Sequence, residues 1–401
     1  MNESKPITRA AGDTPSPPAD GFGSVVLLLQ GGGALGAYQA GVYEALLEHG
    51  VEPTWLAGIS IGAINSAIIA GNPVRERVAK LRAFWELVSS ETPGLGGFWT
   101  GLYSDGAARG MVNQVAAGQA LISGVPGFFT PRFPPPPLQP NGTVAATSWY
   151  DTTELKPTLE RLVDFDRINA LETRLSVGSV NVRTGNFAYF DNAETKLRAA
   201  HIIASAALPP AFPAIEIDGE FYWDGGMVTN TPLSWVLSER TGLDTLVLQV
   251  DLWSARGAMP GDLSQVAVRM KEIQYSSRTR AMTDAFRRSQ SLRAAFNELL
   301  AQLPPDLADL PQAKLLAQAS DPAVYNIVEL IYRSPTYEGE SKDYEFSRQT
   351  MEDHWRAGYR AANKTLSHPE VLQRPTAPSA VNVFDYLRQQ IIAGPEDPFQ
   401  D

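Results

Sequence analysis

The chain has 401 residues, with 33 Lys and Arg against 44 Asp and Glu, so its formal net charge is −11. An overall acidic chain repels phosphate, which argues against a general nucleic-acid binder as partner. There is no cysteine and there are only four histidines, which excludes disulfides, thiolate metal sites and cysteine nucleophiles and argues against a histidine-rich metal centre. Hydrophobic residues make up 44% of the chain, enough for a sizeable core.

The N-terminal stretch 1–23 is polar and proline-bearing, and it predicts a disordered tail. It shows no basic region leading into an apolar stretch, so no signal peptide is expected. The uncharged stretch 21–43 is nearly long enough to span a membrane. Because it contains Gln30, three consecutive glycines and Gly36, a buried strand, loop and helix are favoured over a transmembrane helix, and a cytoplasmic location is expected.

Two strand–turn–helix units follow the tail. Residues 25–29 form a wholly apolar run, typical of a strand buried on both faces of a parallel sheet. A helix is predicted from about 37 to 48, closed by Gly50. A second strand at 55–59 and a second helix at 62–70 repeat the pattern. This succession predicts a doubly wound α/β sheet.

The stretch 91–149 differs from its surroundings. It follows a predicted surface helix at 73–90, is rich in Gly and Pro, and contains four consecutive prolines from Pro134. A long insertion with little periodicity is often a lid or a binding loop. A flexible surface loop without a function fits the sequence equally well.

Regular patterns resume after Tyr150. The elements predicted next are a helix at 153–163 and strands at 175–182, 187–190, 221–223 and 246–252. Beyond Trp253 the strand signals largely stop, and helical patterns predominate at 263–303, 312–319 and 345–365. The sequence therefore predicts an α/β domain at 24–254 and a helical C-terminal extension at 255–401.

Gly58, Ser60 and Gly62 form a G-x-S-x-G motif where a strand is predicted to turn sharply into a helix. A nucleophile on such a turn needs small neighbours, because strand and helix approach each other closely there. The Ser60 hydroxyl would be exposed at the end of the strand. The amide of Ile61 would lie beside it at a helix N-terminus, where it could stabilise an oxyanion. An ordinary β–α turn is the alternative.

A second glycine motif, from Gly31 to Gly36, also follows a strand and opens a helix. It fits G-x-G-x-x-G, but a dinucleotide site would need an acidic residue at the end of the next strand, and Glu52 lies before that strand. We favour an anion-binding loop in which the amides of Gly31, Gly32 and Gly33 form an oxyanion hole. The absence of a Walker lysine disfavours phosphoryl transfer.

A serine nucleophile needs a general base. His201 lies in an apolar helical stretch and the two C-terminal histidines lie in polar ones, so none of these sits in a tight, glycine-flanked turn. Asp224 does, because it ends an aromatic run and precedes Gly225 and Gly226. Burial among aromatics would raise its pKa and let it act as a general base. An aspartate that caps a β-turn is the alternative.

The three motifs occur in one order, and the proline-bearing stretch 204–213 precedes the last of them. Together they resemble the patatin-like phospholipases over about Val25 to Val250. The resemblance implies a three-layer α/β/α fold with a mainly parallel central sheet, followed here by the helical extension. It also implies a Ser–Asp dyad, with Ser60 as nucleophile and Asp224 as general base, that hydrolyses acyl esters, usually of lipids, without a metal or cofactor.

One position departs from the resemblance. The family often carries Arg or Lys where this chain has Leu35. Stabilisation of an oxyanion would then rest on backbone amides, and a preference for phosphate-bearing lipids is less strongly implied.

The helical stretch from Arg269 to Arg293 is basic in an otherwise acidic chain and carries apolar residues between its cations. A basic amphipathic helix can lie on an anionic membrane, which makes peripheral membrane contact one hypothesis. The solvated outer face of a packed helix is the alternative.

Three functions stay open on the sequence. The first is hydrolysis of lipid acyl esters. The second is an esterase or depolymerase that acts on other acyl esters, such as a storage polyester. The third is a catalytically inactive binding or scaffolding protein with the same fold.

Overall fold

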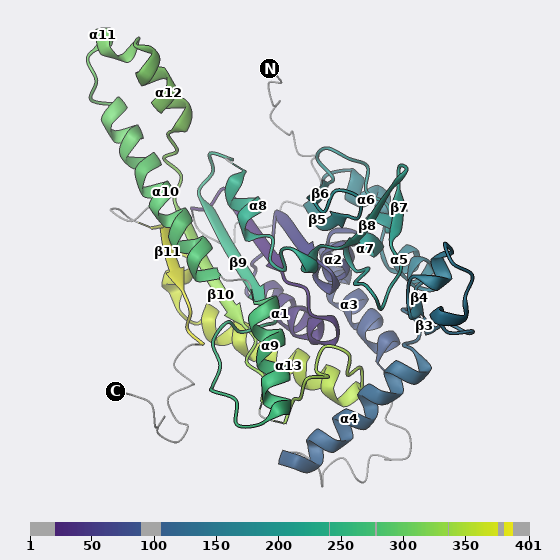
Figure 1. Ribbon diagram of the computed structural model, residues 1–401. Helices are drawn as coiled ribbons and strands as arrows, with labels where there is room; N and C mark the ends of the chain where they lie inside the picture. Colours follow the sequence, from purple (N-terminus) through teal and green to yellow (C-terminus); the bar gives the residue numbers. More distant parts are fainter. Residues whose placement is uncertain are drawn as a thin grey trace.

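The computed structural model describes residues 21–89, 106–239, 241–276, 279–335, 337–375 and 381–387. Its centre is a nine-stranded sheet in the order β11-β10-β9-β1-β2-β5-β8-β7, with β6 paired to β5 (Figure 1). The strands are β1 (Ser24–Leu29), β2 (Trp55–Ile59), β5 (Arg174–Asn181), β6 (Phe187–Asp191), β7 (Ile215–Ile217), β8 (Glu220–Asp224), β9 (Thr245–Asp251), β10 (Tyr325–Ile331) and β11 (Val381–Phe384). The predicted N-terminal tail lies almost entirely outside the described residues.

The sheet is mainly parallel, as predicted. The strands from β11 across to β5 pair in parallel, and β6, β7 and β8 add antiparallel pairs at one side. Every residue of β1, β2 and β9 is buried. Fully buried, largely apolar strands of this kind are stable where helices cover both faces of the sheet.

Helices do cover both faces and give three layers. In β1, Leu27 and Leu29 join a large core cluster on one face, whereas Val26 and Leu28 join a smaller cluster on the other. This alternation is the two-residue period of a strand. The helices of the larger cluster include α1 (Ala37–Glu48), α2 (Ile61–Ala70), α3 (Val74–Val88) and α13 (Arg348–Leu366), and those of the smaller are α8 (Leu233–Ser238) and α10 (Thr279–Leu300).

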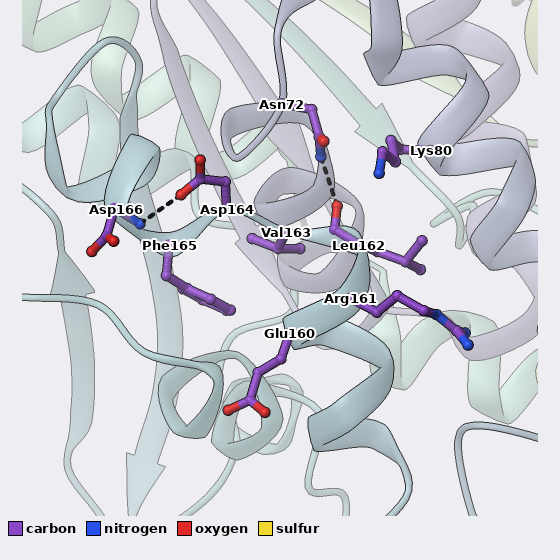
Figure 2. A pocket seen from close by; sticks show the side chains of 9 residues that line it. All are labelled: Asn72, Lys80, Glu160, Arg161, Leu162, Val163, Asp164, Phe165 and Asp166. Carbon is purple, nitrogen blue, oxygen red and sulfur yellow. Dashed lines mark hydrogen bonds between the residues drawn. The ribbon is translucent and has the colours of Figure 1, made fainter.

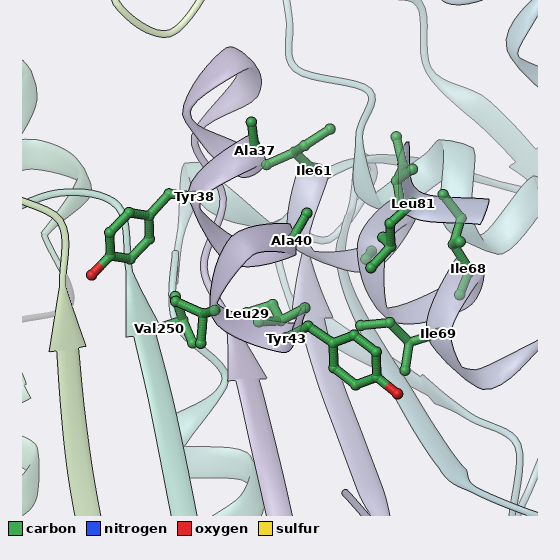
Figure 3. Packing of buried hydrophobic residues seen from close by; sticks show 14 of the residues in the cluster. Leu29, Ala37, Tyr38, Ala40, Tyr43, Ile61, Ile68, Ile69, Leu81 and Val250 are labelled. Carbon is green, nitrogen blue, oxygen red and sulfur yellow. The ribbon is translucent and has the colours of Figure 1, made fainter. Parts of the chain in front are cut away.

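Figure 3 shows part of the larger cluster, in which Leu29 and Val250 of the sheet lie between Tyr38 and Tyr43 of α1. The helix α1 ends as predicted, because Gly50 adopts a φ of 70° directly after it. The remaining elements are α4 (Gly106–Ser123), α5 (Leu155–Leu162), α6 (Phe165–Asn169), α7 (Ala199–Ser205), and the small pair β3 (Thr130–Pro131) and β4 (Tyr150–Asp151).

The prediction that the stretch 91–149 is irregular is wrong in its middle, where α4 spans 18 residues. The buried face of α4 is made of small and polar side chains rather than large apolar ones, so its helical periodicity is weak in the sequence. These buried residues are Arg109, Asn113, Ala116, Ala117 and Ala120. Residues 90–105, at the start of the stretch, lie outside the described part of the chain.

The segment after residue 254 is largely helical, but it also adds β10 and β11 to the sheet, which the sequence analysis did not predict. The helical pattern at 263–303 corresponds to two helices, α9 (Leu263–Tyr275) and α10. Helix α10 begins against the sheet. Together with α11 (Pro305–Ala308) and α12 (Pro311–Ala319) it forms a helical arm, residues 279–319, whose outer part extends away from the sheet (Figure 1). The division into domains at residue 254 stays a prediction.

Candidate active site

Ser60 lies on a sharp turn between β2 and α2. Its φ is 57° and its ψ is −126°, a backbone conformation that residues with a side chain rarely adopt. Such a strained conformation persists only where the surrounding structure holds it, and it is common at functional sites. A Cβ atom on Gly62 would lie 2.1 Å from the carbonyl oxygen of Leu29, and one on Gly58 would lie 2.3 Å from that of Gly62. Strand and helix therefore approach as closely as the G-x-S-x-G motif predicts, and Ser60 itself stays partly exposed.

Asp224 ends β8, on the far side of β5 from β2. The Ser60 side chain lies beside the Asp224 carboxylate and lowers its pKa. The amide of Gly226 donates to Oδ1 of Asp224 at 2.7 Å. Asp224 is 2% exposed. Burial raises the pKa of this carboxyl to about 7, against the opposing effects of Ser60 and of the Gly226 amide. The fold thus places Ser60 and Asp224 near each other, and their roles as nucleophile and general base stay a prediction.

The glycine loop, residues 31–36, lies beside this pair. A Cβ atom on Gly31 would lie 3.0 Å from Cβ of Ser60. The Gly31 amide, however, already donates to the carbonyl oxygen of Asn230 at 3.3 Å, so it is not free to stabilise an oxyanion. Gly32 and Gly33 are partly exposed. The amide of Ile61, the first residue of α2, has no acceptor within its own helix.

Two further residues of the motifs pack the loop against its surroundings. Leu35 is fully buried in the core, so it offers no polar group to a substrate. A Cβ atom on Gly36 would lie 2.5 Å from Cγ1 of Ile61, which brings the glycine loop onto the start of α2. A Cβ atom on Gly225 would lie 2.7 Å from the carbonyl oxygen of Gly178, where the Asp-Gly-Gly turn passes β5.

The sequence analysis missed Ser205, which supports the turn that carries Ser60. The Ser60 amide donates to Oγ of Ser205 at 3.1 Å, and the Ser205 hydroxyl donates to the carbonyl oxygen of Gly178 at 2.6 Å. Ser205 therefore links the turn after β2 to the neighbouring strand β5. Its stretch was part of the family resemblance, but no pattern in the sequence identified this residue.

The three histidines considered as bases have other partners. Nδ1 of His201 accepts the Arg198 amide at 2.9 Å, and burial lowers its pKa. Nε2 of His354 lies 2.9 Å from Oε1 of Glu338 in the core. The ring of His368 stacks on a tyrosine, with centroids 3.9 Å apart.

A surface hollow of about 470 Å³ lies at the far end of α2, one helix length from Ser60 (Figure 2). Nδ2 of Asn72 donates to the carbonyl oxygen of Leu162 at 2.7 Å beside it, a bond that joins the end of α2 to α5. Neither Ser60 nor Asp224 lines this hollow. Within the described ranges, no three His, Asp or Glu side chains gather where they could hold a metal ion.

None of the helices in the described part of the chain combines the length and the apolar composition that a membrane span requires.

Residues 27–236 match a family model described as patatin-like phospholipase, and residues 273–378 match one described as patatin phospholipase. Triacylglycerol lipase SDP1L of Arabidopsis thaliana is 42% identical over 48 residues, which cover 12% of this chain and 6% of that protein. VipD from Legionella pneumophila aligns with 82% of this chain and 67% of its own, at 16% identity and a TM-score of 0.31. Human GIVD cytosolic phospholipase A2 aligns with 87% of this chain and 60% of its own, at 13% identity and a TM-score of 0.42.

Proposed function

The chain belongs to the patatin-like phospholipase family, whose members hydrolyse acyl esters of lipids, and we propose that it does so through a dyad of Ser60 and Asp224. The observation that supports the proposal is that a partly exposed serine on a sharp turn lies beside a buried carboxyl whose pKa is about 7. A base with a pKa near neutrality is well matched to accepting and returning a proton.

In the first half of the proposed reaction, Oγ of Ser60 attacks the ester carbonyl carbon while the carboxylate of Asp224 accepts the hydroxyl proton. The carbonyl π electrons move onto the oxygen and leave an oxyanion, which the amides of Gly32, Gly33 and Ile61 would bind. The C–O bond to the leaving alcohol then breaks, and protonated Asp224 returns the proton to that oxygen. An acyl ester on Ser60 remains.

In the second half, Asp224 takes a proton from a water molecule, whose oxygen attacks the acyl carbon. The second oxyanion uses the same amides. Collapse of this intermediate releases the fatty acid, and the proton on Asp224 returns to Oγ of Ser60. The products are one carboxylic acid and one alcohol for each water consumed.

The test compares three serine and aspartate variants on a soluble p-nitrophenyl ester and with a fluorophosphonate probe. We expect S60A to lose both probe labelling and hydrolysis, and D224N to lower kcat by about 10²–10⁴-fold. The matched control is S66A in the same helix, because the Ser66 hydroxyl is buried without a hydrogen-bond partner among the described residues. S66A should keep wild-type activity.

Two outcomes would overturn the dyad: labelling that persists in S60A, or full activity in D224N. A wild-type protein that takes no label would instead be an inactive scaffold. A substrate panel of phosphatidylcholine, lysophosphatidylcholine, triolein and polyhydroxybutyrate then separates lipid hydrolysis from polyester depolymerisation. Lipid hydrolysis is the expected result.

We also propose that the protein contacts a lipid surface peripherally. The basic stretch suggests that attraction to anionic lipid drives this contact, whereas we propose that apolar side chains drive it. Of the cations there, Arg269 pairs with Glu272 at 3.1 Å and Lys271 with Asp343 at 2.9 Å. The outer face of α9 instead exposes an apolar stripe at helical spacing, formed by Leu263, Val266, Met270 and Ile273. Such a stripe favours insertion of apolar side chains over attraction of charge.

Flotation with phosphatidylcholine vesicles tests this contact. We expect binding that persists in high salt and that M270D abolishes. L315D is the matched control, because Leu315 is equally exposed, at 67% against 62% for Met270, but lies on α12. Binding that requires anionic lipid and disappears in high salt would favour the basic stretch, and unchanged binding of M270D would exclude the stripe.

A further inference from the structure

The glycine loop is covered by a segment that lies more than 300 positions further along the chain, residues 338–347, here called the covering segment. The Ala34 amide donates to the carbonyl oxygen of Asp343 at 2.8 Å. Gly33 has a φ of 55°, and a Cβ atom on it would lie 2.1 Å from the same oxygen. The covering segment therefore contacts the backbone of the glycine loop directly, at one of the residues proposed to bind the oxyanion.

The end of α9 contacts the loop from another direction. Nδ2 of Asn230 donates to the carbonyl oxygens of both Gly31, at 3.0 Å, and Tyr275, at 2.9 Å. Nε2 of Gln30 also donates to the carbonyl oxygen of Tyr275, at 3.1 Å. Nε1 of Trp253 donates to the carbonyl oxygen of Gly31 at 3.0 Å. Both Trp253 and Tyr275 lie beyond the first family match at 27–236.

Two lysines join α9 to the covering segment. Nζ of Lys271 lies 2.9 Å from Oδ1 of Asp343 and donates to the carbonyl oxygen of Glu340 at 2.8 Å. Nζ of Lys342 lies 2.9 Å from Oε1 of Glu272. The side chain of Lys342 is 1% exposed and that of Glu272 is 15% exposed, so water screens this pair weakly. Helix α9 and the covering segment are thus joined to each other, and both contact the glycine loop.

We propose that Lys271 is a positioning residue for the oxyanion hole. Through Asp343 it fixes the covering segment, and through the covering segment it fixes the backbone at Gly33. This inference rests on the proposed function, and it gives the region after residue 254 a part in catalysis. Amides stabilise an oxyanion only where they already point at it before the reaction, so a small displacement of the loop weakens that interaction. A misplacement of about 1 Å can reduce a rate by about 10²-fold.

The experiment measures kcat and KM on a soluble p-nitrophenyl ester for K271M, K271R and K314M. We expect K271M to lower kcat by about 10- to 100-fold and to leave KM nearly unchanged, because the amides act on the transition state. K271R should recover most of the loss. The control K314M also breaks a Lys–Asp pair, that of Lys314 with Asp309 at 3.2 Å, but in the helical arm, and it should keep wild-type kcat.

D343N removes the same ion pair with little change in volume, so it replaces K271M if that variant does not fold. The double variant K271M/D343N should lose no more activity than K271M alone, since D343N removes a contact that K271M already lacks. Wild-type kcat in folded K271M or D343N would overturn the inference, as would no recovery in K271R. If S60A is inactive while these variants are fully active, only the positioning role fails; if S60A is active, the proposed function itself fails.

Discussion

Helix α13 and the helical arm both come from the C-terminal third of the chain, yet they differ in how they meet the rest of the molecule. α13 packs along α1, and its buried residues include Met351, His354, Trp355, Gly358 and Ala362. In α12 of the arm, Ala313 is the buried residue, and Leu315 is 67% exposed. Figure 1 shows the arm extending away from the sheet while α13 lies against it. A helical pattern in the sequence therefore predicts a helix but not its role.

The contact between α13 and α1 is a backbone contact. A Cβ atom on Gly358 would lie 1.9 Å from the carbonyl oxygen of Tyr38, and one on Gly41 would lie 1.9 Å from that of Trp355. Since α1 follows the glycine loop directly, α13 belongs to the packed region that supports the candidate active site. We expect substitutions in this packed region to have large effects and those in exposed helices to have small ones.

The largest expected effect concerns the candidate active site, which the packed region supports. There, kcat/KM should depend strongly on pH. Asp224 must be deprotonated to accept the Ser60 proton, and its pKa is about 7. The deprotonated fraction, and with it kcat/KM on a soluble ester, should rise about 100-fold from pH 5 to pH 8. The arm variant L315D should show the same profile. A profile governed by a pKa near 4 would contradict the buried state of Asp224.

The next largest effect is expected on the free energy of unfolding, when Gly358 in α13 is replaced by alanine. G358A places a methyl group against the backbone of α1, and overpacking of this kind destabilises by about 1–3 kcal/mol. Urea unfolding followed by circular dichroism measures the change. A stability equal to that of the wild type would mean that α1 and α13 separate without loss.

A glycine-to-alanine substitution at a position with free space around it should have a smaller effect on stability, and of opposite sign. Gly118 lies inside α4, and a Cβ atom on it would meet nothing within 4 Å. G118A should therefore stabilise the protein by about 0.5–1 kcal/mol, because glycine is a poor helix former. The same unfolding experiment gives the value, and destabilisation would show that α4 has a close neighbour at this position.

The smallest effect is expected when the outer part of the helical arm is removed. The amide of Asp321 lies 3.5 Å from the carbonyl oxygen of Arg293, so the two ends of the deleted stretch can be rejoined. Replacing residues 295–318 by a short Gly-Ser linker should leave kcat on the soluble ester unchanged. A large loss of kcat would show that the arm supports the site as α9 does, and the contrast between the two regions would then be wrong.

The sequence predicted the features whose causes are local. The strands at 25–29 and 55–59 were found because their residues are apolar on both faces, and the motif glycines were found because a sharp turn excludes side chains. Strand β10 was missed, because polar residues interrupt it. Asn326 in that strand is fully buried, since its Nδ2 donates to the carbonyl oxygens of Val371 and Gln373, both at 2.9 Å. No local pattern could predict partners so far along the chain.

By itself, the sequence determined the order of the early strands and helices and the family, and it predicted Ser60 and Asp224 as the catalytic pair. Only the tertiary structure decided that the Gly31 amide is occupied, that Asp224 is buried with a pKa of about 7, and that Lys271 and Asp343 connect α9 to the covering segment. The physical reason is that burial and competition for hydrogen bonds depend on which distant residues meet in space, as Gln30 and Tyr275 do across 245 positions of the chain.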